Sequence, residues 1–193
     1  AMGLYGALTK DNALNQAYPG VTYVNQISLF YSEVDPVLNT AIAAGCFGAN
    51  ADPACGTGTL PAAISSALNY LPKYFLVNGM PADGTVLTPA GLTNENTLIR
   101  FFNAGFESHV PELLGAYLRL IAESGYLYPV AKNQYTVELH AQQTIDAIFN
   151  TPTEGTYPLF DRSMNLSNGV TPGVSGMMVR LSVVAPVAIV PPV

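Results

Sequence analysis

The sequence has few of the side chains that bind metals or carry charge. Its 193 residues include two histidines, two cysteines and no tryptophan, and only 10% of them are charged. An average soluble domain has roughly 25% charged residues. Catalytic copper or zinc needs several imidazoles or thiolates that converge on one ion. We therefore expect no such metal site and no bound cofactor in this chain by itself.

Low charge also narrows the possible partners. The formal net charge is −6 and the seven Lys and Arg residues are scattered, which excludes the clustered basic surface of a nucleic-acid-binding protein. No apolar run reaches the roughly 18 residues of a membrane span. The chain opens without the basic start and apolar core of a signal peptide, so we interpret this opening as internal, after a removed export signal and an earlier segment. A weakly charged surface suits an extracytoplasmic protein, or one whose faces are covered by partners.

The two cysteines lie close together. Cys46 and Cys55 enclose eight residues that are rich in Gly, Ala, Asn and Pro. In an exported protein, such a short polar loop is most simply closed by a disulfide. The alternative is a pair of unbonded thiols in a flexible insertion. Neither cysteine has a His or a second Cys at metal-ligand spacing, which disfavours a metal site.

Strand signals recur along the chain. Residues 20–33 alternate and are rich in β-branched and aromatic side chains, and residues 73–77 precede the tight turn Asn78-Gly79. Turn signals also occur at residues 123–125, 129, 141–143 and 153–155. Further strands are predicted at 96–103, 117–123, 134–140, 144–150, 155–160 and 176–184. Their spacing of about ten residues predicts an all-β sandwich or Greek-key barrel.

Two segments differ from this strand pattern. Residues 37–72 are rich in Ala, Gly, Asn and Thr, and we predict that they form an insertion with short helices at 37–44 and 60–69 and the cysteine loop at its tip. Residues 185–193 contain three prolines in an apolar setting. Proline cannot donate to a sheet ladder, so this end is an edge strand, a linker or an arm that docks elsewhere.

Residues 103–112 contain the candidate functional side chains. His109 could donate one ligand or one hydrogen bond to a bound group, but we favour a structural role in which it packs beside Pro111 with its ring nitrogens on the backbone. Glu107 and Glu112 are the nearest candidates for the carboxylate pair of a glycoside hydrolase, although acidic loop residues are usually only solvated. We keep Glu107, His109 and Glu112 as candidate binding residues and predict no catalytic residue. The second histidine, His140, is expected at the surface.

Six segments between residues 2 and 184 form a recognisable series. They are Met2-Gly3-Leu4-Tyr5-Gly6-Ala7-Leu8, Tyr31-Ser32-Glu33-Val34-Asp35-Pro36, Tyr74-Phe75-Leu76-Val77-Asn78-Gly79-Met80-Pro81, Leu98-Ile99-Arg100-Phe101-Phe102-Asn103-Ala104-Gly105, Leu118-Arg119-Leu120-Ile121-Ala122-Glu123-Ser124-Gly125 and Gly155-Thr156-Tyr157-Pro158-Leu159-Phe160-Asp161-Arg162. In this order and spacing, they resemble the multicopper oxidases, and specifically their second, central cupredoxin domain.

The resemblance implies a cupredoxin-like Greek-key β-sandwich or barrel over residues 20–184, with the Cys-containing loop insertion at 37–72. In this family, a segment of the Met-Gly-Leu-Tyr-Gly type follows the last copper histidines of the first domain. Residues 1–19 would then be the end of a preceding cupredoxin domain, and residues 185–193 a Pro-rich arm or linker. The family's His-x-His and His-Cys-His motifs have no counterpart here, so no copper ligand is carried over. Ser124 also departs from the Asp that is usual before this Gly.

Three functions are compatible with these features. The resemblance implies a central domain or subunit of a multicopper oxidase, which couples substrate oxidation to the reduction of O2 with copper carried by other segments or chains. Its partners would be other cupredoxin domains of the same oxidase. The alternative is a copper-free structural or binding module of an extracellular assembly that self-associates by strand addition through residues 185–193. A hydrolase that uses Glu107 and Glu112 is the third. The first two place the chain outside the cytoplasm, in the periplasm or the extracellular space.

Overall fold

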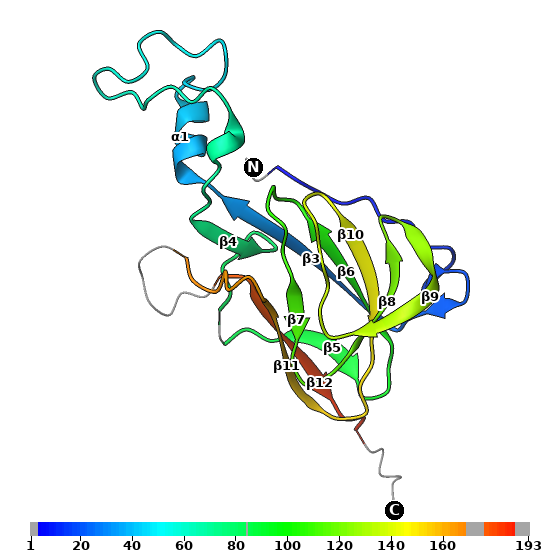
Figure 1. The fold of residues 1–193 in the computed structure, drawn as a ribbon. Helices are drawn as coiled ribbons and strands as arrows, with labels where there is room; N and C mark the ends of the chain where they lie inside the picture. Colours follow the sequence, from blue (N-terminus) through cyan, green and yellow to red (C-terminus); the bar gives the residue numbers. More distant parts are fainter. Residues whose placement is uncertain (1–3, 84, 169–175, 188–193) are drawn as a thin grey trace, which may run out of the picture.

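Two β-sheets face each other in the computed structural model, which describes residues 4–83, 85–168 and 176–187 (Figure 1). The larger sheet has the strand order β4-β3-β6-β10-β8-β9, and the smaller has the order β5-β12-β11-β7. The strands of the larger sheet are β3 (Asn25–Val34), β4 (Tyr74–Val77), β6 (Thr97–Asn103), β8 (Leu118–Glu123), β9 (Tyr126–Gln134) and β10 (Thr144–Phe149). Those of the smaller sheet are β5 (Thr88–Leu92), β7 (Pro111–Leu113), β11 (Gly155–Asp161) and β12 (Met178–Val184).

The chain crosses repeatedly between the two sheets. It passes from β4 to β5, from β6 to β7 and back to β8, and finally from β10 to β11. Because of these crossings, β3 and β6 are parallel neighbours, as are β5 and β12, while the other paired strands are antiparallel. This arrangement confirms the predicted all-β Greek-key sandwich. It also makes residues 104–110 a connection between the sheets.

The main core lies between the sheets. Alternate side chains point inward from both, as expected for strands that have one face toward the core. The larger sheet contributes Leu29, Tyr31, Ile99, Phe101, Leu118, Leu120, Ala147 and Phe149, and the smaller contributes Leu113, Tyr157, Leu159, Leu181 and Val183. Edge-to-face packing of Phe149 on Tyr157, with ring centroids 5.5 Å apart, joins the two layers.

A second, smaller apolar cluster lies on the outer face of the larger sheet. The hairpin β1 (Gln16–Tyr18) and β2 (Val21–Thr22) covers this face with Ala17, Tyr18 and Val21. Beneath it are Leu98, Ile121, Ala122 and Ile148. Strands β6 and β10 are therefore covered on both faces, and their side chains are almost continuously buried instead of alternating.

Most predicted strands occur, with shifts of one or two residues at their ends. The segments predicted at 96–103, 117–123, 144–150, 155–160 and 176–184 correspond to β6, β8, β10, β11 and β12. The predicted turn at Asn78-Gly79 is confirmed, with both residues at positive φ. The strand predicted over 20–33 begins later, because residues 21–22 belong to the outer hairpin. Strands β5 and β7 were not predicted.

The strand predicted over 134–140 is wrong. The strand in this region is β9, which forms a hairpin with β8 through Ser124 and Gly125, both at positive φ. The turn predicted at Pro129 is wrong, because this residue lies inside β9, at the sheet edge, where the pairing register with β8 shifts. A missing N–H is tolerated at an edge bulge. After β9, residues 136 and 139 make only isolated bridges, to Glu112 and His109.

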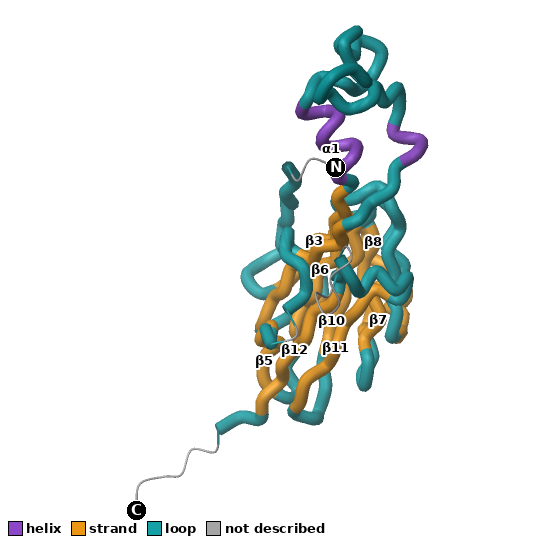
Figure 2. The backbone as a smooth tube through the Cα atoms, turned by 90° about the vertical axis from the view of Figure 1, so that its left-hand side faces the viewer, coloured by secondary structure: helices purple, strands orange, loops and turns teal. Residues whose placement is uncertain are grey.

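Residues 37–72 project from one end of the sandwich, as the two views show (Figure 1 and Figure 2). Helix α1 (Pro36–Ala43) agrees with the predicted helix at 37–44, and Asp35 caps its first turn. The helix predicted over 60–69 is reduced to the 3-10 turn η1 (Ala67–Asn69), because Pro61 and two serines interrupt the segment. The predicted disulfide between Cys46 and Cys55 is confirmed, with Cα atoms 5.7 Å apart.

The first and last described residues lie at opposite ends of the sandwich (Figure 1). Residues 4–12 run along the larger sheet, where Tyr5 stacks on Phe30. The predicted Pro-rich arm begins at Ala185, whose N–H donates to Glu154, but its residues 188–193 lie outside the described part of the chain, as do residues 1–3. Among the described helices, none has the length and apolarity needed to cross a membrane.

Candidate functional site

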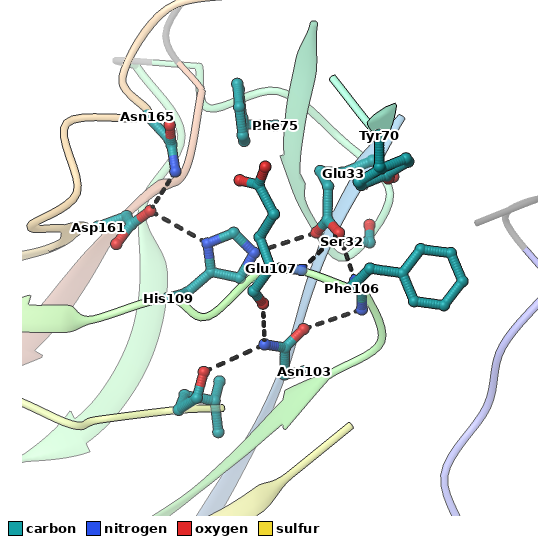
Figure 3. Close-up of polar contacts among 12 residues, drawn as sticks. Ser32, Glu33, Tyr70, Phe75, Asn103, Phe106, Glu107, His109, Asp161 and Asn165 are labelled. Carbon is teal, nitrogen blue, oxygen red and sulfur yellow. Dashed lines mark hydrogen bonds and ion pairs between the residues drawn. The ribbon is translucent and has the colours of Figure 1, made fainter. Parts of the chain in front are cut away.

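The connection between β6 and β7 is shaped by one asparagine side chain. Asn103, the last residue of β6, accepts a hydrogen bond from the Gly105 N–H at 2.9 Å. Its Nδ2 donates to the carbonyls of Glu107 at 2.7 Å and Leu139 at 3.1 Å. These bonds curl residues 104–108 back over the end of the sheet (Figure 3). His109 is consequently directed into the space between the two sheets.

His109 lies between two carboxylates from opposite sheets. Its Nε2 is 3.1 Å from Glu33 Oε2, at the end of β3, and its Nδ1 is 3.2 Å from Asp161 Oδ2, at the end of β11 (Figure 3). The side chains of all three residues are inaccessible to solvent. This group, the Glu33–His109–Asp161 cluster, links the larger sheet, the crossing loop and the smaller sheet.

Backbone N–H groups complete the coordination of both carboxylates. Glu33 Oε1 accepts from the N–H groups of Phe106 and Glu107. Asp161 Oδ1 accepts from Val110 at 2.9 Å and Ser163 at 3.2 Å, and Asn165 Nδ2 donates to Asp161 Oδ2 at 2.8 Å. Charge-assisted hydrogen bonds of this kind stabilise the ionised form of a buried carboxylate.

The cluster holds His109 as an imidazolium. Burial alone would lower the pKa of His109, but the hydrogen bonds and charges of Asp161 and Glu33 outweigh it and raise the pKa to about 9. Burial tends to raise the pKa of Glu33 and of Asp161 as well, yet the hydrogen bonds from His109 and from the backbone lower both. Each ring nitrogen therefore donates to a carboxylate, and the cluster carries a net charge of −1.

Gly105 is required by the packing of this cluster. A Cβ atom at this position would lie 1.8 Å from Glu33 Oε2 and 2.4 Å from Glu33 Cδ. Glu33 cannot retreat, because its side chain is buried and bonded to the loop backbone. Only glycine lets the loop approach the carboxylate closely enough to donate its N–H groups.

The three candidate binding residues, Glu107, His109 and Glu112, lie in different environments. Glu107 lies beside the cluster, where partial burial and then the charge of Glu33 raise its pKa. Glu112 lies on β7 and pairs with Arg162, with Oε2 3.6 Å from Nε. The ring nitrogens of His109 bond to carboxylates and not to the backbone, so that detail of the favoured structural prediction is wrong.

Ser108 contacts His140 across the surface, with Oγ 3.4 Å from Nδ1. His140 Nε2 lies 3.7 Å from Glu138 Oε1. The His140 and Glu138 side chains are 60% and 77% exposed, so solvent competes for both contacts. This row of side chains lacks the short bonds and the burial that activate a nucleophilic serine. His140 is at the surface, as predicted.

The available donors do not fit a copper centre. Both cysteines are consumed by the disulfide, and both ring nitrogens of His109 are bonded to carboxylates. Within residues 4–83, 85–168 and 176–187, no group of three or more His, Cys, Asp or Glu side chains is arranged to hold a metal ion. We therefore derive no reaction step through copper bound to this chain.

Sequence reasoning missed the two partners of His109. Glu33 and Asp161 lie 76 and 52 residues away from it along the chain. A signal was nevertheless present, because each is an acidic residue near the end of a strand rich in aromatic and aliphatic side chains, in a chain with little charge. Charged residues are almost never fully buried unless they are paired, so such positions demand a partner.

With its crossing strands and two-layer core, the chain is a cupredoxin-like β-sandwich. The solved structures that share this fold include a blue copper oxidase from Nitrosomonas europaea, with a TM-score of 0.61 and 17% identity over 83% of this chain and 44% of that chain. Another is the multicopper oxidase mgLAC, with a TM-score of 0.60 and 18% identity over 86% of this chain and 46% of that chain. Fet3p, a multicopper oxidase that functions in iron import, matches with a TM-score of 0.51 and 14% identity over 89% of this chain and 30% of its own.

These structures share the fold of this chain at low sequence identity, and the chain spans less than half the length of each of them. No family model matches the chain, and no curated protein matches it in sequence. The likeness confirms the cupredoxin-like fold that the sequence predicted.

Proposed function

We propose that this chain is the central, copper-free cupredoxin domain of a multicopper oxidase. Copper on other segments or chains would couple the oxidation of a substrate to the reduction of O2. The observation that carries the proposal is the combination of a fold shared with multicopper oxidases and a histidine whose two nitrogens are both occupied by buried carboxylates. The other cupredoxin domains of the same oxidase are its partners.

In this role the domain acts through rigidity. The Glu33–His109–Asp161 cluster fixes the crossing loop to both sheets, and the second apolar cluster fixes the hairpin β1–β2 to the outer face. A domain braced in this way can hold two neighbouring domains at a constant separation. The disulfide and the low charge support an extracytoplasmic location.

The test is metal analysis and an oxygen-consumption assay on the purified 193-residue chain, alone and together with the segments that carry the copper motifs. We expect the chain alone to bind less than about 0.1 copper per molecule and to consume no O2. Copper loading and O2 consumption should arise only when the other segments are present, and a complex should form with them in size-exclusion chromatography.

Two outcomes would contradict the proposal. Stoichiometric copper in the isolated chain would show that a site exists within it. Failure to associate with any copper-bearing segment, together with self-assembly of the chain into polymers, would favour the structural module of an extracellular assembly.

A further inference from the structure

The projecting insertion contains a cavity that the proposed function does not use. A space of about 360 Å³ lies between helix α1 and residues 63–73. Pockets that bind small molecules usually enclose about 300 to 1,000 Å³ and are mostly apolar with a few polar groups. This cavity matches that description. Its apolar lining consists of Val37, Leu38, Ala63, Ile64, Ala67 and Leu71.

One carboxylate fixes both walls of the cavity at its base. Asp35 Oδ1 accepts from the N–H groups of Val37 at 2.9 Å and Leu38 at 3.1 Å, which belong to α1. Its Oδ2 accepts from the N–H of Leu71 at 2.9 Å, on the opposite wall. Asp35 is 4% exposed, so it is held by the backbone and is not available to a ligand.

A second set of bonds joins Ile64, in the lining, to the residues that follow α1. The Ile64 N–H donates to the Cys46 carbonyl at 2.9 Å, and the Gly48 N–H donates to the Ile64 carbonyl at 2.8 Å. The disulfide between Cys46 and Cys55 constrains the same segment. The two walls are thus joined by two sets of bonds, and the cavity exists before any ligand arrives, which lowers the entropic cost of binding.

The polar groups of the lining select the head group of a ligand. Lys73 is exposed and supplies the cationic side chain of the lining, and the hydroxyls of Ser65 and Ser66 lie along the same wall. Asp35 keeps its negative charge and interacts electrostatically with Lys73, but its oxygens are buried and already accept three backbone hydrogen bonds. The Lys73 ammonium is therefore the charged group that an incoming molecule can contact directly. An ammonium next to an apolar surface complements a carboxylate on an apolar body.

We propose that this cavity binds a small, largely apolar molecule with a single carboxylate, such as an arylalkanoic acid or a short alkanoic acid. The carboxylate pairs with Lys73, and the apolar body lies between α1 and residues 63–71. Tyr70 connects the cavity to the sandwich, because its hydroxyl donates to the Glu33 carbonyl and its ring packs edge-on against Phe106. The inference does not depend on the proposed oxidase function.

The test uses 3-phenylpropionate and its neutral analogue 3-phenylpropionamide as probes. Each is titrated into the 15N-labelled chain while amide chemical shifts are recorded by NMR. We expect saturable shifts at Val37, Ile64, Ala67 and Leu71, with a Kd of about 1 mM for a ligand of about eleven heavy atoms. The amide should bind about two- to fivefold more weakly than the acid, the range of an exposed ion pair.

Matched variants separate the two parts of the site. Lys73→Gln should weaken the acid about two- to fivefold and leave the amide unchanged, while the control Lys10→Gln should change neither. Ala67→Phe should fill the cavity and weaken both probes by about tenfold or more, while Leu68→Ala, a neighbour outside the lining, should not. Ala63→Phe repeats the filling test from the adjoining segment if Ala67→Phe does not fold.

The proposal is overturned if no saturable shift occurs up to about 10 mM, or if the shifts map outside the insertion. It is also overturned if the unmodified chain binds acid and amide equally, or if the filled variants bind as well as the unmodified chain. None of these outcomes bears on whether the chain joins copper-bearing segments, so failure here is distinct from failure of the proposed oxidase role.

Discussion

His109 should make the fold less stable as the pH rises above neutrality. Its pKa is about 9 in the folded protein, against an ordinary value of 6.5. A group with a raised folded pKa contributes stability that is fully present below the unfolded value and is lost as the pH rises through the folded value. A difference of about 2.5 pKa units, at about 1.4 kcal/mol each, gives a contribution of about 3 kcal/mol. The side chain is inaccessible to solvent, so solvent screening does not reduce this value.

Urea unfolding followed by far-UV circular dichroism measures the effect at pH values from 5.5 to 9.5. The free energy of unfolding should fall by about 3 kcal/mol between pH 6 and pH 9.5. The variant His109→Gln should lose this pH dependence, and at pH 6 it should be about 3 to 5 kcal/mol less stable, because two buried carboxylates lose their cation. His140→Gln removes an exposed imidazole and should match the unmodified protein.

The carboxylates predict the opposite dependence in acid. The pKa values of Glu33 and Asp161 are lowered, so their contribution is present above their unfolded values and is lost as the pH falls through the folded ones. Stability should therefore be greatest between about pH 5 and pH 6.5.

A flat or rising free energy of unfolding between pH 6.5 and pH 9 in the unmodified protein would refute an imidazolium at position 109. The same pH profile in His109→Gln and in the unmodified protein would refute it as well. If His109→Gln does not fold, NMR titration of the His109 ring in the His140→Gln variant gives its pKa directly, and a pKa at or below 6.5 would be decisive against the argument.

Three further changes test other parts of the structure by the same unfolding assay. Gly105→Ala places a Cβ against Glu33 and should lower the free energy of unfolding by at least about 2 kcal/mol. In the control Gly6→Ala, the added Cβ meets no atom within 4 Å, so stability should hardly change. Equal losses in the two variants would argue against the close approach of residue 105 to Glu33. Replacement of Cys46 and Cys55 by serine should lower the free energy of unfolding by about 2 to 3 kcal/mol. Amide hydrogen exchange should become faster in residues 45–65 but not in β6 or β10, and faster exchange throughout would mean that the insertion does not open independently of the sandwich. Asn168→Ala should cost about 1 to 2 kcal/mol, because the Asn168 amide pairs with both the N–H and the carbonyl of Phe75 on edge strand β4. The control is Asn133→Ala, on the exposed strand β9. A loss of stability no larger than that of the control would disprove the pairing.

Local features of the fold were predictable. Asn78-Gly79 and Ser124-Gly125 are turn sequences whose residues tolerate positive φ, and both form tight turns. Helix α1 follows Asp35-Pro36, a capping residue and a proline that suits the first helical turn. Each of these signals depends on residues a few positions apart, so one sequence suffices to detect them.

Two elements were predicted wrongly, one because of its place in the sheet and one because helix-breaking residues within the segment were underweighted. Pro129 signals a break, yet at the bulged edge of a sheet it is accommodated inside β9. The segment 60–69 has alanines and leucine that favour a helix, but only η1 forms, beyond Pro61 and the serines. At Pro129 the neighbours in space outweigh the local preference, whereas in residues 60–69 the proline and the serines within the segment interrupt the helix.

The strand pattern and the two closely spaced cysteines are enough to predict an all-β protein whose insertion is most simply closed by a disulfide, and the residue counts leave too few imidazoles and thiolates for a copper cluster. The charge of His109 cannot be predicted in this way, because it depends on contacts with Glu33 and Asp161, which lie 76 and 52 residues away along the chain. An ion pair in a buried site gains its strength from distance and from the exclusion of water. Both are set by how the two sheets pack, and neither is encoded within the loop at 103–112.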